Sequence, residues 1–504
     1  MRALLLHRDR DFDLQQRPPY NVTALIGDLG LEVVLEAMAD GDEFVFNVSR
    51  KAIPAAMEND IDTILYRQDI LKDCLRHPDV VRQLYDLAGE ALQKKKKHWF
   101  GLFASHPSSI LYDSIELMHL FVDMLRKLRD FAVQHAAGFE SAGFTALFAT
   151  LQQELSDAYL GEINRHLRQL KFPGGVFVSA QLGEGNEGTN YVIRKPQRNE
   201  APWLARMMRK GPPSYTYRIA ERDEAGARAL GELRDRGINP VANALAQSVD
   251  HVVSFFTVLR TELAFYVGCL NLYEKLVKKG QPVCFPLPVP AGGGTEHFSG
   301  LYDVSLTLST DSRVVGNSAN ADGKRLVIIT GANQGGKTTF LRSIGSAQLM
   351  MQCGMFVGAD AFGAEVCRAL FTHYRHEEDP TMKSGKLDEE LARMSEIVDH
   401  LVPGSLVLFN ESFAATNERE GSEIASQIVR ALLEKGVKVF FVTHLYAFAH
   451  GFLPRRTADA LFLRAERQPD GTRTFRLTEG EPLETSYGED VYRQVFEGAE
   501  ATAP

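Results

Sequence analysis

The chain has 504 residues, 44% of them hydrophobic and 24% charged, which is the composition of an ordinary globular protein with room for about two to four domains. Its formal net charge of -9 excludes a basic surface over the whole molecule, so any contact with nucleic acid would have to be local. The five scattered cysteines contain no CxxC pair, predict neither a disulfide framework nor a zinc site, and fit a reducing cytoplasm. We expect no signal peptide, and no run of 18 apolar residues predicts a membrane span.

The N-terminal part of the chain predicts mixed structure followed by helices. In residues 1–60, the alternation of Phe44, Phe46 and Val48 with other residues predicts a short strand. Apolar residues then fall at helical spacing, and a helical core is predicted over residues 61–280.

A run of four lysines interrupts this helical pattern: Lys94, Lys95, Lys96 and Lys97. Charge runs more often mark a solvated face or a loop than a binding site, and that is our first interpretation. The alternative is that these lysines contact a phosphate backbone.

Two features divide the rest of the helical region. Near residues 172–195, two short apolar segments flank a glycine-rich turn, which predicts a small pair of strands inserted between helices. Residues 281–300 include a stretch rich in proline and glycine, and they predict a linker. A final domain is then expected over residues 301–504.

In this final domain, strands and helices alternate, which is the pattern of a parallel sheet covered by helices. The apolar runs of residues 326–329, 406–409 and 437–442 predict three buried strands. Residues 473–477 predict a fourth, antiparallel strand.

The first of these strands ends in a glycine-rich turn that leads into a helix. Gly331, four further residues, and then Gly336, Lys337 and Thr338 satisfy the P-loop pattern. Glycines let successive backbone N–H groups converge on phosphate oxygens, and the start of the helix adds the positive end of its dipole. The lysine would reach the β- and γ-phosphates of ATP, and the threonine hydroxyl would bind Mg²⁺. The fold class we expect is multidomain: a helical domain with a small β insertion, followed by an α/β P-loop (ABC-like) ATPase domain.

The second strand ends in Asn410 and Glu411, the position at which P-loop proteins bring an acid to Mg²⁺ and water. Glu411 is the expected general base or water-orienting residue. The preceding position is usually aspartate. Because Asn410 keeps an oxygen but has no charge, we expect weaker coupling to Mg²⁺, and hydrolysis does not follow automatically from binding.

The third strand is followed by His444. Ligands bind at the carboxyl ends of strands in such sheets, so this histidine could contact the γ-phosphate or the attacking water. A structural role is the alternative. Its place after the two preceding motifs favours a role in function.

The segments TGANQGGKTTFLRSIG, SLVLFNESFAATNEREG and FFVTHLYAFA resemble the ATPase core of the MutS family of DNA mismatch-repair proteins. Thr485–Gly488, Glu262–Leu276 and Asp62–Leu71 resemble that family's ATPase ending, its lever helix and the start of its helical core. The resemblance implies that ATP is held by Gly331, Asn333, Gln334, Gly335, Gly336, Lys337, Thr338 and Thr339. It implies Mg²⁺ ligands at Thr338, Asn410 and Glu411, and catalytic roles for Lys337, Glu411 and His444.

The resemblance also implies a homodimer with two composite ATP sites and lever helices that couple nucleotide state to a DNA clamp. Ser384 and Gly385 look like the segment that reaches the partner's γ-phosphate. The chain departs from the family in having no room before its helical core for a mismatch-recognition domain, and its F-x-E sequence, Phe409–Glu411, lies inside the second motif. An intercalating wedge is therefore not expected, nor is a nuclease-like extension at the C-terminus.

Three functions stay open on these grounds. The first is a dimeric ATPase clamp that recognises the structure of double-stranded DNA, holds phosphates through Lys94–Lys97 or the basic stretch of residues 194–210, and meets repair partner proteins in the cytoplasm (at the nucleoid in a bacterium). The second is a nucleotide-dependent protein-interaction switch, in keeping with the acidic balance. The third, prompted by Asn410, is a nucleotide-binding protein with little turnover.

Overall fold

The computed structural model describes residues 1–99, 106–173, 175–194, 215–216, 218–220, 222–375, 385–455, 459–468 and 471–484. The chain forms two compact units. The first unit comprises Met1–Ala3, Gln83–Gly138 and Thr145–Arg260, and the second comprises Leu4–Arg82, Phe139–Phe144 and Thr261–Pro504.

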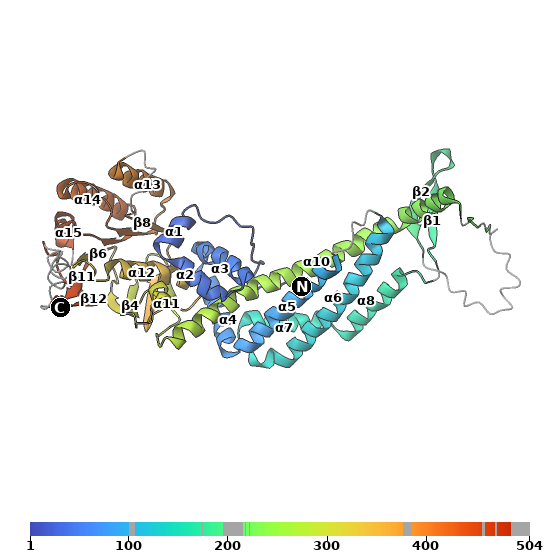
Figure 1. The fold of residues 1–504 in the computed structure, drawn as a ribbon, viewed down its shortest axis with the longest axis horizontal. Coiled ribbons are helices and arrows are strands. Elements are labelled where there is room, and N and C mark those ends of the chain that lie inside the picture. Colours follow the sequence, from blue (N-terminus) through green and yellow to red (C-terminus); the bar gives the residue numbers. More distant parts are fainter. Residues whose placement is uncertain are drawn as a thin grey trace, which may run out of the picture. The chain divides into compact units, whose positions relative to one another are not determined.

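The first unit consists of long helices and one β hairpin (Figure 1). Its helices are most of α5 (Pro78–Trp99), α6 (Pro107–His135), most of α7 (Ala142–Glu154), α8 (Asp157–Leu170) and the larger part of α10 (Glu224–Lys278). The hairpin pairs β1 (Val178–Leu182) with β2 (Gly188–Ile193) in antiparallel fashion. The described helices and the hairpin lie in the segments where the sequence predicted helices and a β insertion.

Helix α10 is the one described helix that is long and apolar enough, by length and composition alone, to cross a membrane. Of its most apolar stretch, 67% is buried inside the protein. That degree of burial is typical of a helix in a protein core, because a lipid-facing helix would leave its apolar surface uncovered.

The second unit begins with helices, where the sequence predicted a strand. They are α1 (Val22–Asp28), α2 (Leu31–Ala39), α3 (Glu43–Ala55), the 3-10 turn η1 (Ala56–Glu58) and α4 (Ile61–Arg76). The predicted strand around Phe44 is wrong, because the Asp42 carboxylate caps α3 by accepting from the N–H groups of Phe44 and Val45. Val45, Val48 and Ala52 are buried at the spacing of a helix rather than that of a strand.

The N-terminal segment packs into the second unit and is not a separate domain. The Glu262 carboxylate accepts from the backbone N–H groups of Leu5 (2.6 Å) and Phe12 (2.9 Å). The buried Arg67 guanidinium donates through Nε to the carbonyl of Leu6 at 2.7 Å. The compact units therefore divide the chain elsewhere than at the predicted boundaries of residues 60 and 280, because these long-range bonds join distant segments.

A six-stranded sheet forms the centre of the second unit, in the order β12-β11-β6-β10-β9-β8. Its strands are β6 (Leu326–Gly331), β8 (Leu370–Tyr374), β9 (Leu406–Asn410), β10 (Lys438–Val442), β11 (Ala460–Arg467) and β12 (Arg473–Glu479). All neighbours are parallel except β11 and β12. The four predicted strands are confirmed, including the antiparallel one. Strands β8 and β11 were not predicted, because polar or charged residues interrupt their apolar runs.

A second sheet has the order β3-β7-β4-β5. Its strands are β3 (Leu287–Val289), β4 (Glu296–Leu301), β5 (Asn317–Asn320) and β7 (Ala361–Glu365). Residues 281–300 therefore contain β3 and most of β4, and their prediction as a linker is wrong. Pro288 is accommodated because β3 lies at the edge of the sheet, where a missing N–H breaks no ladder.

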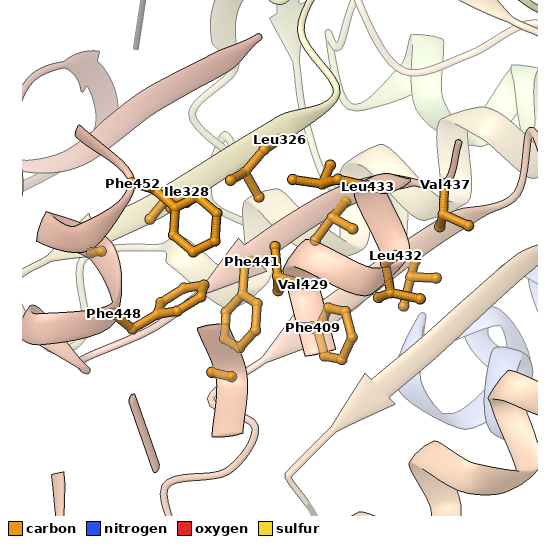
Figure 2. Close-up of a cluster of buried hydrophobic side chains, with 14 of the residues drawn as sticks. Leu326, Ile328, Phe409, Val429, Leu432, Leu433, Val437, Phe441, Phe448 and Phe452 are labelled. Carbon is orange, nitrogen blue, oxygen red and sulfur yellow. The ribbon is translucent and has the colours of Figure 1, made fainter. Parts of the chain in front are cut away.

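Helices cover both faces of the central sheet (Figure 1). They include α12 (Lys337–Gln352), α13 (Lys386–His400) and α14 (Glu418–Glu434), which contact its strands. Helix α11 (Val304–Ser309) packs on α2 and α12, and α15 (Tyr446–Gly451) packs on α14 and is followed by the short turn η4 (Leu453–Arg455). Figure 2 shows the buried cluster formed by Leu326, Phe409 and Phe441 of the sheet with Val429 of α14 and Phe448 of α15. This core fixes β6, β9 and β10 side by side, and their carboxyl ends carry the candidate site.

Candidate active site

The turn between β6 and α12 requires glycine at two places. Gly331 has a φ of 103° and Gly336 a φ of 86°, both in the region that favours glycine. A Cβ atom on Gly331 would lie 2.8 Å from the backbone nitrogen of Ala465 on the neighbouring strand. The loop therefore curls closely against β11 and places the N-terminus of α12 at its open side.

Lys337, the first residue of α12, is buried within this loop. Its ammonium donates to the carbonyls of Gly331 at 3.0 Å and Ala332 at 2.9 Å. Burial lowers the pKa of Lys337 to about 8; Glu411 opposes this shift and Arg473 adds to it. A negatively charged ligand at the loop would favour the protonated form.

A hollow of about 410 Å³ opens at the P-loop, which is within the size range of small-molecule sites. Its polar wall contains Asn333, Gln334, Gly335, Gly336, Lys337, Thr338, Thr339 and Glu411. Its other wall is partly apolar and includes Leu301, Val314, Val315 and Phe475. Apolar surface beside a loop with the P-loop pattern would suit a ligand with a flat base and a phosphate chain.

Thr338 and Asn410 meet at one corner of this site. The Thr338 hydroxyl donates to Asn410 Oδ1 at 2.9 Å. Mg²⁺ takes octahedral oxygen ligands at about 2.0–2.1 Å, so neighbouring ligand oxygens lie about 3 Å apart. The two oxygens thus have the chemistry and the spacing of adjacent Mg²⁺ ligands, and this pair fits the ion.

The order of the strands brings Glu411 to His444. Strand β10 lies between β6 and β9, and Val442 stands opposite Asn410 in the register. The imidazole Nε2 of His444 lies 2.9 Å from the Glu411 carboxylate, as in an N–H···O hydrogen bond. This bond is the main cause that lowers the pKa of Glu411; burial opposes the shift, and the charges of His444, Lys337 and Arg375 add to it.

Three residues other than glycine that line the hollow have a left-handed backbone: Gln334 (φ 58°), Glu411 (φ 56°) and Phe475 (φ 58°). This conformation costs roughly 1–2 kcal/mol per residue. Such strain gathers at functional sites when the surrounding structure holds it. Gln334 and Glu411 follow the buried strands β6 and β9, which supply that support.

The structure adds residues that sequence reasoning missed. Asn317 of β5 donates to the carbonyl of Phe475 at 3.3 Å, and its own side-chain oxygen accepts from Leu477 N–H at 2.7 Å. Arg473 donates to the carbonyl of Asn333 at 3.1 Å. None of them stands in a phosphate-binding motif, and only the pairing of distant strands brings them to the loop.

One further predicted site residue that the structure describes, Gly385, lies outside this hollow. It is the N-cap of α13. Ser384, the segment Thr485–Gly488 and most of the basic stretch of residues 194–210 lie outside the described residues. Their predicted roles stay predictions.

The four lysines lie near the end of α5, not in a loop. Lys94 pairs with Glu90 at 2.6 Å, and Lys127 of α6 shares that carboxylate at 3.2 Å. Lys96 and Lys97 are exposed. Because successive residues of a helix point about 100° apart, the four lysines cannot form one flat patch.

The sequence of the chain is similar to those of known proteins. The model of the MutS2 N-terminal domain matches residues 59–279, and that of MutS domain V matches residues 327–499. The chain is 27% identical over 203 residues to MutS protein homolog 4 of Mus musculus (38% of this chain, 20% of the relative). It is 32% identical over 200 residues to endonuclease MutS2 of Thermus thermophilus (38% and 26%) and 29% over 194 residues to DNA mismatch repair protein MutS of Streptococcus mutans (38% and 23%). The matches thus span about a quarter or less of these relatives' length.

Proposed function

The chain belongs to the MutS family, and from this we propose that it binds ATP with Mg²⁺ at the P-loop and hydrolyses it. The observation that carries this proposal is that Lys337, Thr338 and Glu411 line one hollow, with Asn410 hydrogen-bonded to Thr338 and His444 to Glu411.

The roles follow from the contacts. The N–H groups of the loop and the Lys337 ammonium would hold the phosphates, and Thr338 and Asn410 would hold Mg²⁺, which neutralises charge on the transferred phosphoryl group. Glu411 would orient the attacking water and accept its proton. His444 would keep the Glu411 carboxylate ionised and in place.

ATP turnover of the wild-type chain and Glu411→Gln tests this assignment. We expect Glu411→Gln to lower kcat by at least about 100-fold, since a positioned acid or base contributes 10²–10⁴-fold. Binding of a fluorescent ATP analogue should persist. A variant that hydrolyses ATP as fast as wild type would remove Glu411 from the mechanism.

Asn410 makes the rate of turnover a separate question. Asn410→Asp adds a charge where Mg²⁺ would bind, and we expect it to tighten Mg²⁺ dependence roughly tenfold, about 1.4 kcal/mol. The Mg²⁺ concentration that gives half-maximal turnover measures this effect. Very slow turnover in wild type together with fast turnover in Asn410→Asp would favour a nucleotide-binding switch.

We further propose that nucleotide state is coupled to binding of double-stranded DNA by a dimer, recognised by structure rather than by sequence. The support is the family and helix α10, whose residues Glu224–Arg260 belong to the first unit and Thr261–Lys278 to the second. A continuous helix can carry displacement as a rigid element. Repair proteins as partners, and a cytoplasmic location in keeping with five free cysteines, are part of the same proposal.

The alternative is a protein-interaction switch with weak or no DNA binding. The observation in its favour is that Lys94, one of the predicted phosphate contacts, already pairs with Glu90. Turnover with and without duplex, mismatched and branched DNA at two salt concentrations separates the two. Stimulation that fades steeply with salt supports the DNA clamp, because phosphate contacts release counterions; no response to any DNA supports the switch.

A further inference from the structure

Three buried side chains close to Glu411 in the sequence or in hydrogen bonding do not line the hollow described above. They are His373 at the end of β8, Ser412 directly after Glu411, and Glu390 in α13. Their exposed fractions are 0%, 0% and 4%. Because burying such groups without partners is costly, their mutual bonds specify one arrangement.

Hydrogen bonds link the members of this group to one another and to Phe413. Ser412 Oγ lies 2.6 Å from the carbonyl of His373 and 2.7 Å from the imidazole Nδ1 of the same residue. The His373 Nε2–H donates to the carbonyl of Glu390 at 2.9 Å. The Glu390 carboxylate accepts from the N–H of Phe413 at 2.7 Å.

These bonds stabilise the strained turn formed by residues 411–413. Glu411 (φ 56°) and Phe413 (φ 62°) both have a left-handed backbone, and Ser412 stands between them. Each left-handed residue costs roughly 1–2 kcal/mol, so two of them in three positions persist only where neighbours hold them. The Phe413 ring stacks on His373 with centroids 5.2 Å apart and belongs to the buried cluster drawn in part in Figure 2.

Glu390 links helix α13 to the turn, because its carboxylate accepts from the Phe413 N–H and its carbonyl accepts from His373. Glu390 lies one helical turn from Lys386, where α13 begins after its N-cap Gly385. Tyr374 of β8 is tied to the same helix, because Arg393 donates to its carbonyl at 2.9 Å. A shift of the start of α13 would therefore move the Phe413 N–H. Because Glu411 lies only two residues before Phe413, it would move as well.

We propose that Glu390, Ser412 and His373 are positioning residues: they hold the backbone turn that carries Glu411 and connect it to α13. The position of this helix would then regulate hydrolysis without changing ATP binding. The inference rests on the proposed ATPase function. It assigns to α13 the regulation of the water-orienting step, separate from the phosphate-binding loop.

The test compares Glu390→Ala with the matched control Glu389→Ala. The control also replaces a glutamate by alanine, but at the preceding position of the helix. We expect Glu390→Ala to lower kcat about tenfold, with the KM for ATP and the affinity for a fluorescent ATP analogue within twofold of wild type. Hydrogen exchange of the Phe413 amide should become faster. Glu390→Gln should restore most of kcat, because its amide oxygen can still accept from Phe413, and Glu389→Ala should match wild type.

Ser412→Ala serves where Glu390→Ala fails to fold, since it removes only a hydroxyl, and the same split between kcat and KM is expected. Unchanged kcat in both variants, or a loss of kcat in proportion to loss of nucleotide affinity and of thermal stability, would overturn the positioning role. If the wild-type chain hydrolyses ATP and Glu390→Ala has the same kcat, this inference alone is overturned. If the wild-type chain shows no ATP turnover that Glu411→Gln abolishes, the proposed function is overturned as well.

Discussion

The carboxyl edge of the six-stranded sheet and the β1–β2 hairpin are both β structure, yet they are built in opposite ways. Every residue of β6 is buried, and β10 and β9 flank one another with the aromatic rings of Phe409 and Phe441 stacked 4.8 Å apart. No residue of β1 or β2 is buried. A two-stranded hairpin with so little burial is only marginally stable on its own.

The difference shows where side-chain geometry carries information. At the sheet edge, the buried core fixes backbone positions, so Lys337, Thr338 and Glu411 face one hollow with defined bonds. In the first unit, the candidate DNA contacts are side chains on a helix surface, such as Lys96 and Lys97. Solvated charges of this kind are attracted to any polyanion, and their arrangement names no particular ligand.

The largest expected effect concerns the hollow at the edge of the six-stranded sheet, where the buried core fixes the side chains. Lys337→Ala should weaken ATP binding roughly 100- to 1,000-fold, because it removes a charged donor to phosphate from a buried site. Titration with a fluorescent ATP analogue measures it, and Lys435→Ala, an exposed lysine of the same unit, should have no effect. If Lys337→Ala keeps full nucleotide affinity, the P-loop assignment fails.

A second effect concerns the residue that holds Glu411. His444→Ala removes a hydrogen bond to a carboxylate, worth roughly 1.5–3 kcal/mol, so kcat should fall between about 10- and 100-fold with little change in KM. Steady-state ATPase kinetics measure both constants. An equal loss in His444→Ala and in the exposed neighbour His450→Ala would point to general destabilisation instead.

The pH dependence of ATP binding is the third test. The pKa of Lys337 in the free protein is about 8, and bound phosphates raise it, so the complex holds more protons than the free protein above pH 8. ATP affinity should therefore be constant below pH 7 and fall about tenfold between pH 7 and pH 9. Lys337→Ala should abolish this dependence; an unchanged slope in that variant would assign the titration to another group.

The smallest expected effect concerns the exposed lysines of α5 in the first unit. Replacing Lys94, Lys95, Lys96 and Lys97 by alanine should reduce the slope of log K for DNA against log salt by about 2, since the slope changes by about 0.9 per phosphate contact and two of the lysines are exposed. ATP affinity without DNA should not change. A slope identical to that of the control Lys127→Ala would exclude these lysines from DNA binding.

Local chemistry determined much of this protein from its sequence. The strand of apolar residues ending at Gly331, the glycines of the turn and the lysine after them define a P-loop without knowledge of the rest of the chain. Helices with clear stripes of buried residues, such as α6, and the small β insertion were predictable for the same reason. The strand predicted near Phe44 failed, because the cap at Asp42 and the burial of Val45 and Val48 outweigh a short alternation.

Tertiary structure decided what no local pattern contains. The pairing of β11 against β6 makes Gly331 obligatory, the insertion of β10 between β6 and β9 brings His444 to Glu411, and β5 with β12 supplies Asn317 and Phe475 to the hollow. The edge position of β3 turns an apparent proline-rich linker into a strand. Each depends on contacts between segments far apart in the chain, and the free energy of such contacts comes from burial that a single segment cannot achieve alone.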